Sequence, residues 1–561
     1  MKDQVAELLN QAVSQLKSKG VIPEQHPVRV MVDNTRDKAH GDLASNIALT
    51  LAKPCGQPPR AMAEQIIAAL PDNALIAKVE IAGPGFINVF LAGTSSAEIV
   101  SEILNQGVTF GRNAQGNGAK VQVEFVSANP TGPLHVGHGR GAAVGDSLCR
   151  LLTANGYDVT REFYYNDAGA QIKNLALSVQ ARVRGLGPDD HDWPEDGYRG
   201  NYIADVANSY MNSDSIDADD RHVTGSANAE DLNAIKEFAV AYLRRDQDLD
   251  LKAFGVHFDV FFLESSLYND GKVEATVKRL IEQGFTYESE GALWLKTTEF
   301  GDDKDRVMRK KDGGYTYFLP DVAYHQDKFD RGFKRVINEQ GADHHSTVTR
   351  VRAGLQALQM GVPEGYPDYV LHQMVMVTKG GKEVKLSKRA GSYVTLRDLI
   401  DEVGCDATRY FLVSRRADSQ LTFDIDLARS QSNDNPVYYI QYAHARVQAL
   451  LRKLEQEGHS FNQQQGIEAL GQLDLDDERA LMTQLRRYPE AVAHAGQSLE
   501  PAGIATFLKD LASQFHAYYN NNRMLVDDAE LRNGRVALAV AVGQVLANGL
   551  DLLGVSAPES M

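Results

Sequence analysis

The residues Val-Gln-Val-Glu-Phe-Val at 121–126 lead directly into Ser-Ala-Asn-Pro-Thr-Gly-Pro-Leu-His-Val-Gly-His at 127–138. The first six residues alternate and are rich in β-branched side chains, which predicts a strand. The two prolines and the glycine that follow break regular structure and predict a loop. From His135 onward, small residues and leucines at helical spacing, as far as Leu152, predict a helix. A strand, a loop and a helix N-terminus in this order present backbone N–H groups to phosphate.

A second segment, Lys-Leu-Ser-Lys-Arg at 385–389, lies 250 residues after His135 and is followed by Gly391. Such a loop can close over phosphates and neutralise charge that develops in a transition state. His135 and His138 add two imidazole donors. Each segment alone is a weak signal, and the alternative for the first is a glycine-rich turn with structural histidines. Together, in this order and at this distance, they predict a site for a nucleoside triphosphate.

The same region also matches a dinucleotide-binding fingerprint, because Gly137, Gly139 and Ala142 are correctly spaced and Glu162 follows about 20 residues later. That fingerprint requires its first glycine directly after the strand. About ten residues intervene here, and the two histidines would have no role. The sequence therefore disfavours a dinucleotide enzyme.

Composition and charge restrict the class of protein. A chain of 561 residues is expected to hold three or four domains. Its net charge of −17 argues against a generic nucleic-acid coat protein, although local basic patches leave a specific RNA partner open. The three cysteines are far apart and form no CxxC, so we expect no disulfide framework, no protein-bound zinc and a reduced, cytoplasmic environment. The N-terminus lacks the apolar run of a signal peptide, and the apolar stretch 536–542 is too short to span a membrane.

The chain is predicted to be a multidomain α/β protein. Residues 1–112 form an α+β module, with a helical stripe from Val5 to Leu16 and strands at 28–32 and 87–91. Residues 113–377 form an α/β nucleotide domain with a polar, Asp-rich insertion near 185–250. A connecting domain with the lysine-rich loop follows at 378–432. Helical periodicity then predicts a C-terminal helical bundle at 433–561.

The two segments resemble the signatures of class I aminoacyl-tRNA synthetases. Longer runs across essentially the whole chain resemble the arginyl-tRNA synthetase family within that class: His40–Asn46, Gly83–Asn88, Tyr165–Gly169, Phe318–His325, Gly341–His345 and Ala547–Gly554. The lysine segment departs from the class pattern twice, with Leu386 where Met is usual and Arg389 where Ser is usual. Leu for Met conserves volume, Arg389 adds a positive charge, and both lysines of the pattern are present.

The resemblance implies a Rossmann-type class I core that activates L-arginine with ATP and Mg²⁺ to arginyl-adenylate. The arginyl group would then pass to the 2′-hydroxyl of the 3′-terminal adenosine of tRNA(Arg). The N-terminal module would contact tRNA, and activation would need bound tRNA. We expect a monomer, with Mg²⁺ held by phosphate and water rather than by a protein metal site. The implied catalytic residues are His135, His138, Lys385 and Lys388, and the implied ATP contacts are Pro130, Gly132, His135, Gly137, His138, Gln373 and Lys388.

The resemblance also places an arginine pocket at Glu124, Asn129, Tyr317 and Asp321. A guanidinium offers five donors in a rigid fork and therefore requires acidic partners. We expect Asp321 to bind the guanidinium and Glu124 or Asn129 to bind the α-amino end. On pattern alone, Asp321 could instead cap a helix after a proline. His344 and His345 have no third metal ligand at motif spacing, which favours a structural or substrate-edge role.

In the C-terminal bundle, Tyr439, Tyr442 and Arg446 fall on one helix face at i, i+3 and i+7. Aromatic rings and an arginine suit stacking on single-stranded bases. By resemblance this is the anticodon-binding face, and the alternative is a core stripe of tyrosines. Two other functions remain open. One is a nucleotidylyltransferase that does not use tRNA, and the other is a non-enzymatic binding protein.

Overall fold

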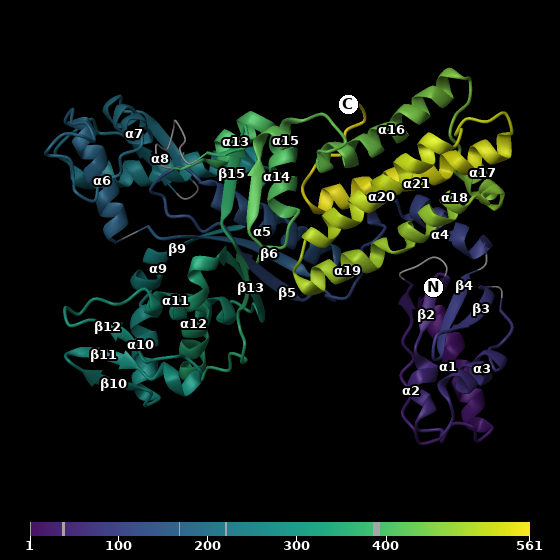
Figure 1. Cartoon of the computed structure of the whole chain (residues 1–561). Helices are drawn as coiled ribbons and strands as arrows, with labels where there is room; N and C mark the ends of the chain where they lie inside the picture. The colour runs from purple at the N-terminus through teal and green to yellow at the C-terminus, as the bar shows by residue number, and fades with distance from the viewer. Residues whose placement is uncertain are drawn as a thin grey trace.

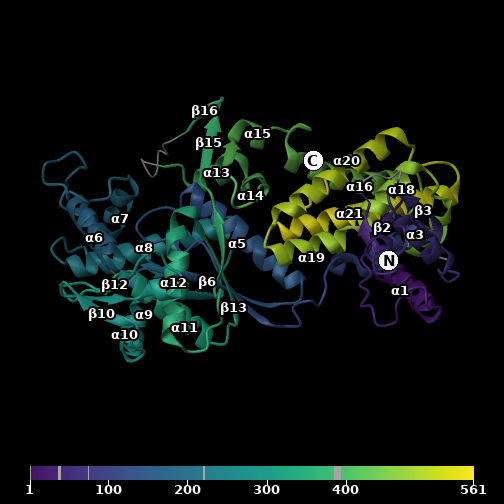
Figure 2. The same cartoon turned by 60° about the horizontal axis from the view of Figure 1, so that its bottom comes forward.

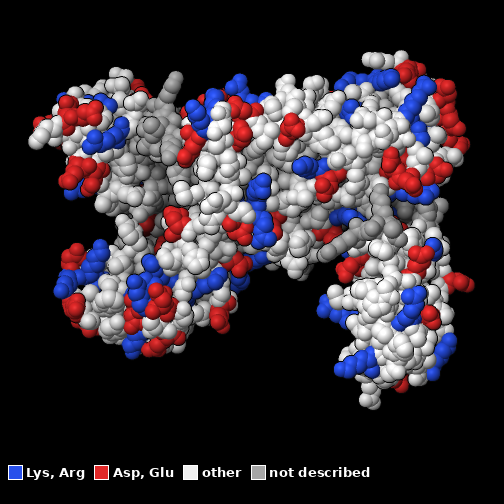
Figure 3. All heavy atoms as spheres, in the orientation of Figure 1, with Lys and Arg blue, Asp and Glu red and all other residues white. Residues whose placement is uncertain are grey.

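The computed structural model describes residues 2–35, 40–73, 75–91, 93–167, 169–218, 221–384 and 393–561. It consists of an N-terminal lobe, a central α/β domain with two inserted lobes, a connecting segment and a C-terminal helical bundle (Figure 1). The face in Figure 3 is deeply hollowed between the N-terminal lobe and the inserted lobe that holds α10. Basic and acidic side chains are interspersed over this face rather than separated by sign.

The N-terminal lobe packs helices against an antiparallel sheet of order β1-β2-β4-β3. Its elements are α1 (Lys2–Ser18), β1 (Asp33–Asn34), β2 (Leu43–Ser45), α2 (Ile47–Ala52), α3 (Pro59–Ala68), β3 (Ile76–Ala82) and β4 (Phe86–Leu91). The predicted helix and the strand at 87–91 are confirmed. The predicted strand at 28–32 is wrong, because only the two residues of β1 pair with a neighbour. Val28, Val30 and Val32 still pack against the core, so their alternation records burial rather than strand pairing.

The core of the N-terminal lobe ends at Leu91. The next elements, α4 (Gly93–Gln106) and η2 (Gly107–Thr109), pack on helices of the C-terminal bundle instead. Val100 and Ile103 of α4 belong to the large core that the bundle shares with the central domain. The helix that the boundary at 112 assigns to the N-terminal module is therefore physically part of the bundle.

The central domain is built on a five-stranded parallel sheet of order β14-β13-β5-β6-β9. The strands are β5 (Lys120–Glu124), β6 (Asp158–Tyr165), β9 (Val260–Leu263), β13 (Arg335–Gly341) and β14 (Asp368–His372). Chain order reverses between β5 and β13, which makes their carboxyl ends the topological switch point where such sheets bind ligands. Helix α5 (Val136–Ala154) begins at this edge. Two further helices of this domain are α11 (Phe318–Asp330) and α12 (His345–Leu358), the latter preceded by η4 (Ala342–His344).

Two inserted lobes interrupt the sheet. The first lies between β6 and β9 and has its own apolar core, although the sequence predicts a polar insertion. Its elements are α6 (Ala170–Val183), α7 (Tyr202–Met211), β7 (Ser215–Ala218), β8 (Arg221–Thr224) and α8 (Leu232–Ala253). The second lobe is not predicted. It contains α9 (Glu264–Asn269), α10 (Lys272–Glu282), β10 (Thr286–Ser289), β11 (Ala292–Leu295), η3 (Thr297–Phe300) and β12 (Arg306–Arg309).

The connecting segment and the bundle complete the chain (Figure 2). The connecting elements are β15 (Val375–Lys379), β16 (Lys382–Glu383), α13 (Leu396–Val403), α14 (Cys405–Val413), β17 (Leu421–Asp424) and α15 (Ile425–Arg429). The bundle, as predicted, is helical: α16 (Pro436–Gln456), α17 (Gln463–Glu468), η5 (Ala469–Gln472), α18 (Asp476–Arg486), α19 (Tyr488–Ser498), α20 (Ala502–Asn521) and α21 (Ala529–Leu552). Helix α21 is long and apolar enough to cross a membrane by composition, but it is mostly buried within the protein.

Candidate active site

The two histidines of the 135–138 segment form the N-terminus of α5. His135 is the N-cap residue, and its Nδ1 accepts a hydrogen bond from the backbone N–H of His138 at 3.1 Å. The His138 Nδ1 accepts from the backbone N–H of His135 at 3.3 Å, so the two side chains form a reciprocal capping box. The rings stack with their centroids 3.5 Å apart. Because both Nδ1 atoms accept, each neutral ring carries its proton on Nε2 and can donate it to a ligand.

The environment keeps both rings neutral. Burial lowers the pKa of His135 to about 4, and the charge of His372 contributes to this lowering. Burial also lowers the pKa of His138 well below its usual value, as do the charges of His135 and His372. Near neutral pH the two imidazoles are therefore donors without net charge.

The strand before this segment ends in a strained turn. Val126 and Ser127 have φ angles of 66° and 41°, which lie in the left-handed region. A β-branched residue rarely adopts this conformation, and such strain concentrates at functional sites. The Ser127 hydroxyl holds the turn by donating to Glu124 at 2.9 Å and accepting from the backbone N–H of Tyr164 at 3.2 Å. The turn ends β5 two residues before the predicted end of the strand.

The glycines at the start of α5 are required for close packing against neighbouring side chains, and this packing accounts for them without a dinucleotide. A Cβ at Gly137 would lie 2.8 Å from the His135 ring, and a Cβ at Gly139 would lie 2.9 Å from Leu396. Glu162, the acid that the dinucleotide fingerprint would require, is fully buried. It is bound by the Arg331 guanidinium and the Tyr324 hydroxyl. It therefore cannot bind a ribose, which excludes the dinucleotide alternative.

The residues that follow the lysine-rich loop lie beside the histidine segment. Val136 donates its backbone N–H to the carbonyl of Val394 at 3.0 Å, and the Tyr393 hydroxyl donates to the carbonyl of Pro133 at 2.9 Å. Lys385 and Lys388 themselves lie outside the described residues. The fold therefore brings the chain on the far side of the loop to the histidines across 250 residues of sequence.

The residues predicted around ATP occupy two sides of α5. Pro130 is buried, and Gly132 lies on the loop that precedes the helix. Gln373 follows β14, and its carbonyl accepts from the Arg140 side chain of α5 at 2.7 Å. The structure thus places Gly132 in the same cavity as His135 and His138, and it joins Gln373 to the helix that contains Gly137.

Three carboxylates converge beyond the carboxyl edge of the sheet. Glu124 ends β5, Glu264 directly follows β9, and Asp321 lies in the first turn of α11. Burial raises the pKa of Asp321 to about 7, and the charges of Glu124 and Glu264 add to this effect. Burial also raises the pKa of Glu264, whose Oε2 accepts from the Tyr164 hydroxyl at 2.7 Å. Carboxylates crowded in this way suit a cationic ligand, whose charge would relieve their repulsion.

A buried lysine already neutralises one of these acids. The Lys328 ammonium is fully buried and donates to Glu124 and, at 3.0 Å, to Asn338. Asn338 in turn contacts His325, whose Nδ1 lies 2.7 Å from the carbonyl of Asp321. Asp321 and Glu264 are therefore the two acids left for a ligand cation. The same helix excludes the capping alternative for Asp321, because α11 begins at Phe318 with Tyr317 as its N-cap.

The other residues predicted for the amino-acid pocket are less enclosed. Tyr317 is 73% exposed. Asn129 donates to Gln171 at 2.6 Å and lines a cavity of about 630 Å³ together with His135 and His138. Glu264 escapes prediction from the sequence because it belongs to no quoted motif. The signal that could have found it is an acid directly after a strand, at an edge where ligands bind.

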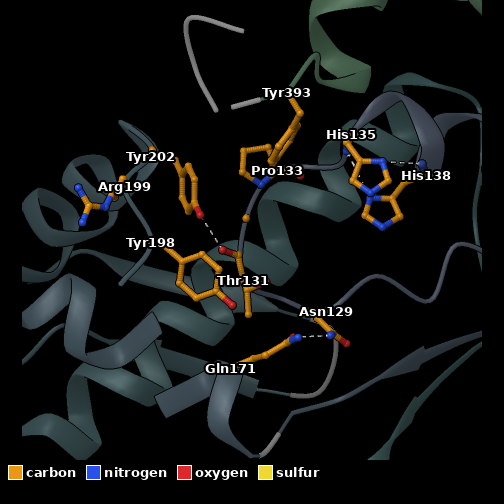
Figure 4. Close-up of a pocket in the computed structure, with 12 residues that line it drawn as sticks. Asn129, Thr131, Pro133, His135, His138, Gln171, Tyr198, Arg199, Tyr202 and Tyr393 are labelled. Atoms are coloured by element: carbon orange, nitrogen blue, oxygen red, sulfur yellow. Dashed lines mark hydrogen bonds between the residues drawn. The ribbon is translucent and has the colours of Figure 1, made fainter. Parts of the chain in front are cut away.

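The cavity beside the histidines is lined by the segment 129–138 on one side and by the first inserted lobe on the other (Figure 4). Tyr198, Arg199 and Tyr202 come from that lobe, and Tyr393 comes from the chain after the lysine-rich loop. The Tyr202 hydroxyl donates to the carbonyl of Thr131 at 2.8 Å and fixes the loop that precedes α5. These residues had no predicted role.

The predicted aromatic face of the bundle is a surface cluster. Tyr439, Tyr442 and Arg446 of α16 are half-buried rather than core residues. His516 of α20 packs against both tyrosine rings at 4.4 and 5.4 Å, and the Arg446 guanidinium lies 4.8 Å from the Tyr442 ring. The Arg446 guanidinium also lies 5.0 Å from the Tyr519 ring. A stacked aromatic and cationic surface of this kind suits exposed nucleobases.

Comparison with known proteins covers almost the whole chain. The family described as "tRNA synthetases class I (R), catalytic domain" matches residues 99–424. The arginyl-tRNA synthetase N-terminal domain matches residues 3–91, and the DALR anticodon-binding domain matches residues 440–561.

Relatives at full length agree with these matches. The arginine–tRNA ligase of Geotalea daltonii is 55% identical over 562 residues and that of Geotalea uraniireducens is 56% identical over 545 residues. The alignments cover 100% of both chains in the first case, and 97% of this chain and 96% of the relative in the second. The Thermus thermophilus arginyl-tRNA synthetase structure has the same fold, with a TM-score of 0.74 at 22% identity over 100% of both chains. By its three family domains and its full-length relatives, the chain belongs to the arginyl-tRNA synthetases of class I.

Proposed function

We propose that this class I synthetase activates L-arginine with ATP and transfers it to the 2′-hydroxyl of the terminal adenosine of tRNA(Arg). The observation that carries the assignment of the site is the pair Asp321 and Glu264, two buried acids with raised pKa values that form no ion pair with a described cation. Arginine is the amino acid whose side chain offers a permanent, forked cation to two carboxylates.

In the first step the arginine carboxylate attacks the α-phosphorus of MgATP, the bond from this phosphorus to the bridging oxygen breaks, and pyrophosphate leaves. Such a reaction needs mainly positioning and charge stabilisation. His135 and His138 donate Nε2–H to phosphate oxygens, because their Nδ1 atoms are held by the helix backbone. By family resemblance Lys385 and Lys388 stabilise the departing pyrophosphate, and Mg²⁺ arrives with the nucleotide.

Arginine is selected by charge and by geometry. Asp321 binds the guanidinium together with Glu264, and a cation there relieves the repulsion that raises the pKa of Asp321. Glu124, already paired with Lys328, shapes the floor of the pocket, and Asn129 faces the α-amino end. Lysine is rejected because an ammonium cannot make the bidentate contact.

In the second step the terminal ribose enters the cavity between the histidine segment and the first inserted lobe. Tyr198, Tyr202 and Tyr393 offer ring faces there, and Arg199 offers a cation for the RNA backbone. At the far end of the molecule, Tyr439, Tyr442 and Arg446 stack on anticodon bases. This face disfavours the alternative of a nucleotidylyltransferase without tRNA. We further propose a monomer in the cytoplasm, in keeping with three unpaired cysteines.

Pyrophosphate exchange with each of the twenty amino acids, with and without cognate tRNA, tests the proposal. We expect exchange with arginine alone, negligible without tRNA and restored by it. Equal exchange with lysine would overturn the arginine pocket, and exchange that ignores tRNA would overturn the tRNA requirement implied by the family. Inactivity with every amino acid would favour a non-enzymatic binding protein.

A further inference from the structure

A third histidine lies at the carboxyl edge of the sheet, on the strand next to the switch point. His372 ends β14 and pairs in register with Gly341, which ends β13. The charge of His372 influences the pKa of both His135 and His138, so the three rings share one electrostatic environment. His372 lies outside both signature segments, so the sequence did not identify it as a site residue.

A buried carboxylate orients this ring. His372 Nδ1 lies 2.6 Å from Oε1 of Glu339, a residue of β13 whose side chain is 1% exposed. A Cβ at Gly141 of α5 would lie 2.7 Å from Glu339 Oε2 and 3.4 Å from the His372 ring, so a glycine at 141 lets this pair pack against the helix. The pair is therefore enclosed between α5 and two neighbouring strand ends.

The hydrogen bond sets a proton position opposite to that of His135 and His138. Since Glu339 accepts, His372 carries a proton on Nδ1. Its Nε2 makes no hydrogen bond to any described residue, and it donates only when the ring is protonated at both nitrogens. His372 can therefore add a positive charge to the site, which the two neutral rings of α5 cannot.

Several charged groups face His372. Burial lowers its pKa, but the charge and hydrogen bond of Glu339 outweigh this, so the net direction is upward. Arg140 of α5 opposes the protonated form, and Asp343 of η4 favours it. Glu339 and Asp343 therefore stabilise the protonated His372 ring, and the buried Arg140 side chain destabilises it.

We propose that His372 is a third phosphate-binding imidazole of this site, held by the positioning residue Glu339, and that its Nε2–H donates to an oxygen of the bound nucleoside triphosphate. The inference rests on the proposed role of His135 and His138 in holding ATP. It adds a side chain whose charge, and therefore whose contribution to ATP binding, depends on pH.

The test measures KM for ATP and for arginine by pyrophosphate exchange with saturating tRNA between pH 6 and 8.5. In the parent, KM for ATP rises with pH as His372 loses its second proton. His372→Gln raises KM for ATP roughly 10- to 100-fold at pH 6.5, as expected for one lost charge-assisted hydrogen bond, and removes the pH dependence. Glu339→Gln shifts the rise in KM to lower pH, because the ring loses the carboxylate that stabilises its cation. KM for arginine changes little in either variant.

His222→Ala is the matched control, because His222 pairs with Asp217 in the same way on the exposed β7–β8 hairpin. A KM for ATP within twofold of the parent in His372→Gln overturns the inference. If His372→Gln does not fold, an unshifted pH profile in Glu339→Gln overturns it instead. His138→Ala separates the two proposals: if it lowers the rate while His372→Gln has no effect, only this inference fails, and if it is as active as the parent, the proposed site fails.

Discussion

The His135 and His138 residues fix each other's proton positions, because each Nδ1 accepts a hydrogen bond from the backbone N–H of the other residue. The spacing of three residues from one to the other is the spacing from an N-cap to N3, so the motif caps its own helix. The structural interpretation of these histidines is therefore confirmed, and it is compatible with the functional one. The hydrogen bonds that stabilise α5 also fix each proton on Nε2, where a phosphate can accept it.

His138→Ala should lower the rate of arginine activation about 10²–10³-fold, the usual effect of removing one preorganised transition-state donor. Affinity for arginine should change much less, because the acidic pocket is untouched. Single-turnover adenylation with tRNA present measures both quantities. His494→Ala, a substitution on α19 of the bundle, serves as control. Near-normal turnover in His138→Ala would show that this residue has no part in the chemistry.

The pKa of Asp321, about 7, makes arginine binding sensitive to pH. As the pH falls through 7 the carboxyl gains a proton and loses the charge that holds a guanidinium, so KM for arginine should rise from pH 8 to pH 6. Asp321→Asn should raise KM strongly at every pH and weaken this trend. Asp330→Asn, at the other end of α11, should leave KM unchanged. A parent KM that is flat from pH 6 to 8 would contradict the assignment.

The raised pKa of Asp321 has the opposite effect on folding stability, which should fall as the pH rises. A folded carboxyl with a raised pKa binds more protons than the unfolded chain between about pH 4 and 7, so the arginine-free protein loses stability as the pH rises through this window. Asp321→Asn should therefore raise the melting temperature at pH 8 in the absence of arginine. Added arginine should stabilise the parent and not the variant. Differential scanning calorimetry at pH 5 and pH 8 would reveal either result.

At the scale of the element, α5 joins the histidine segment to the connecting segment and to the bundle. Its first residues hold the site, and buried Arg140 donates to carbonyls of Gln373, Arg416 and Ser419 on both sides of the connecting segment. Farther along the same helix, Asp146 is bound by Arg150, Arg161 and Arg409. These guanidiniums hold the pKa of Asp146 at about 2, against the effect of burial.

Arg409 connects Asp146 of α5 to the end of the helical bundle. Its guanidinium is fully buried and donates to Asp146, to the carbonyl of Leu553 at 3.0 Å and to that of Phe254 at 2.9 Å. A Cβ at Gly554 would clash with it at 2.2 Å, which explains a glycine there in the close approach of the last helix. The end of α21 is therefore fastened to the helix that carries the histidines.

Arg409→Met should lower the free energy of unfolding by about 3–5 kcal/mol, because it leaves a buried carboxylate short of a partner and two carbonyls without donors. Arg416→Ala should change it little, since that side chain is 59% exposed and pairs at the surface with Asp418 and Glu500. Urea unfolding followed by fluorescence compares the two. A similar, small effect in both variants would show that the buried pair does not hold the domains together.

At the scale of the whole molecule, the N-terminal lobe touches the bundle through few polar contacts. Lys2 and Asn34 bind Glu490 at 2.6 and 2.9 Å, and Arg487 donates to the carbonyl of Thr35 at 3.1 Å. Arg487 therefore makes a contact within the protein. Few contacts cross this boundary, so the lobe should be separable from the rest.

Deletion of residues 2–91 should weaken tRNA binding and leave the catalytic core folded. Deletion of 2–110 should also damage the bundle, because it removes α4, whose Val100 and Ile103 are buried in the shared core. Filter binding of tRNA and far-UV circular dichroism distinguish the two truncations. If removal of residues 2–91 left the affinity for tRNA unchanged, the N-terminal lobe would have no role in RNA binding.

The sequence by itself determined the strand, loop and helix at 121–152, the helical C-terminal bundle and the family, because these rest on local periodicity and on short motifs with little freedom. It placed Asp321 in the pocket only through resemblance. The tertiary structure alone decided that α4 joins the bundle, that Lys328 neutralises Glu124 and leaves Glu264 available, and that His372 approaches the two histidines of α5. Each of these depends on contacts between residues far apart in the chain, made at strand ends and helix faces, and no local pattern of side chains encodes such contacts.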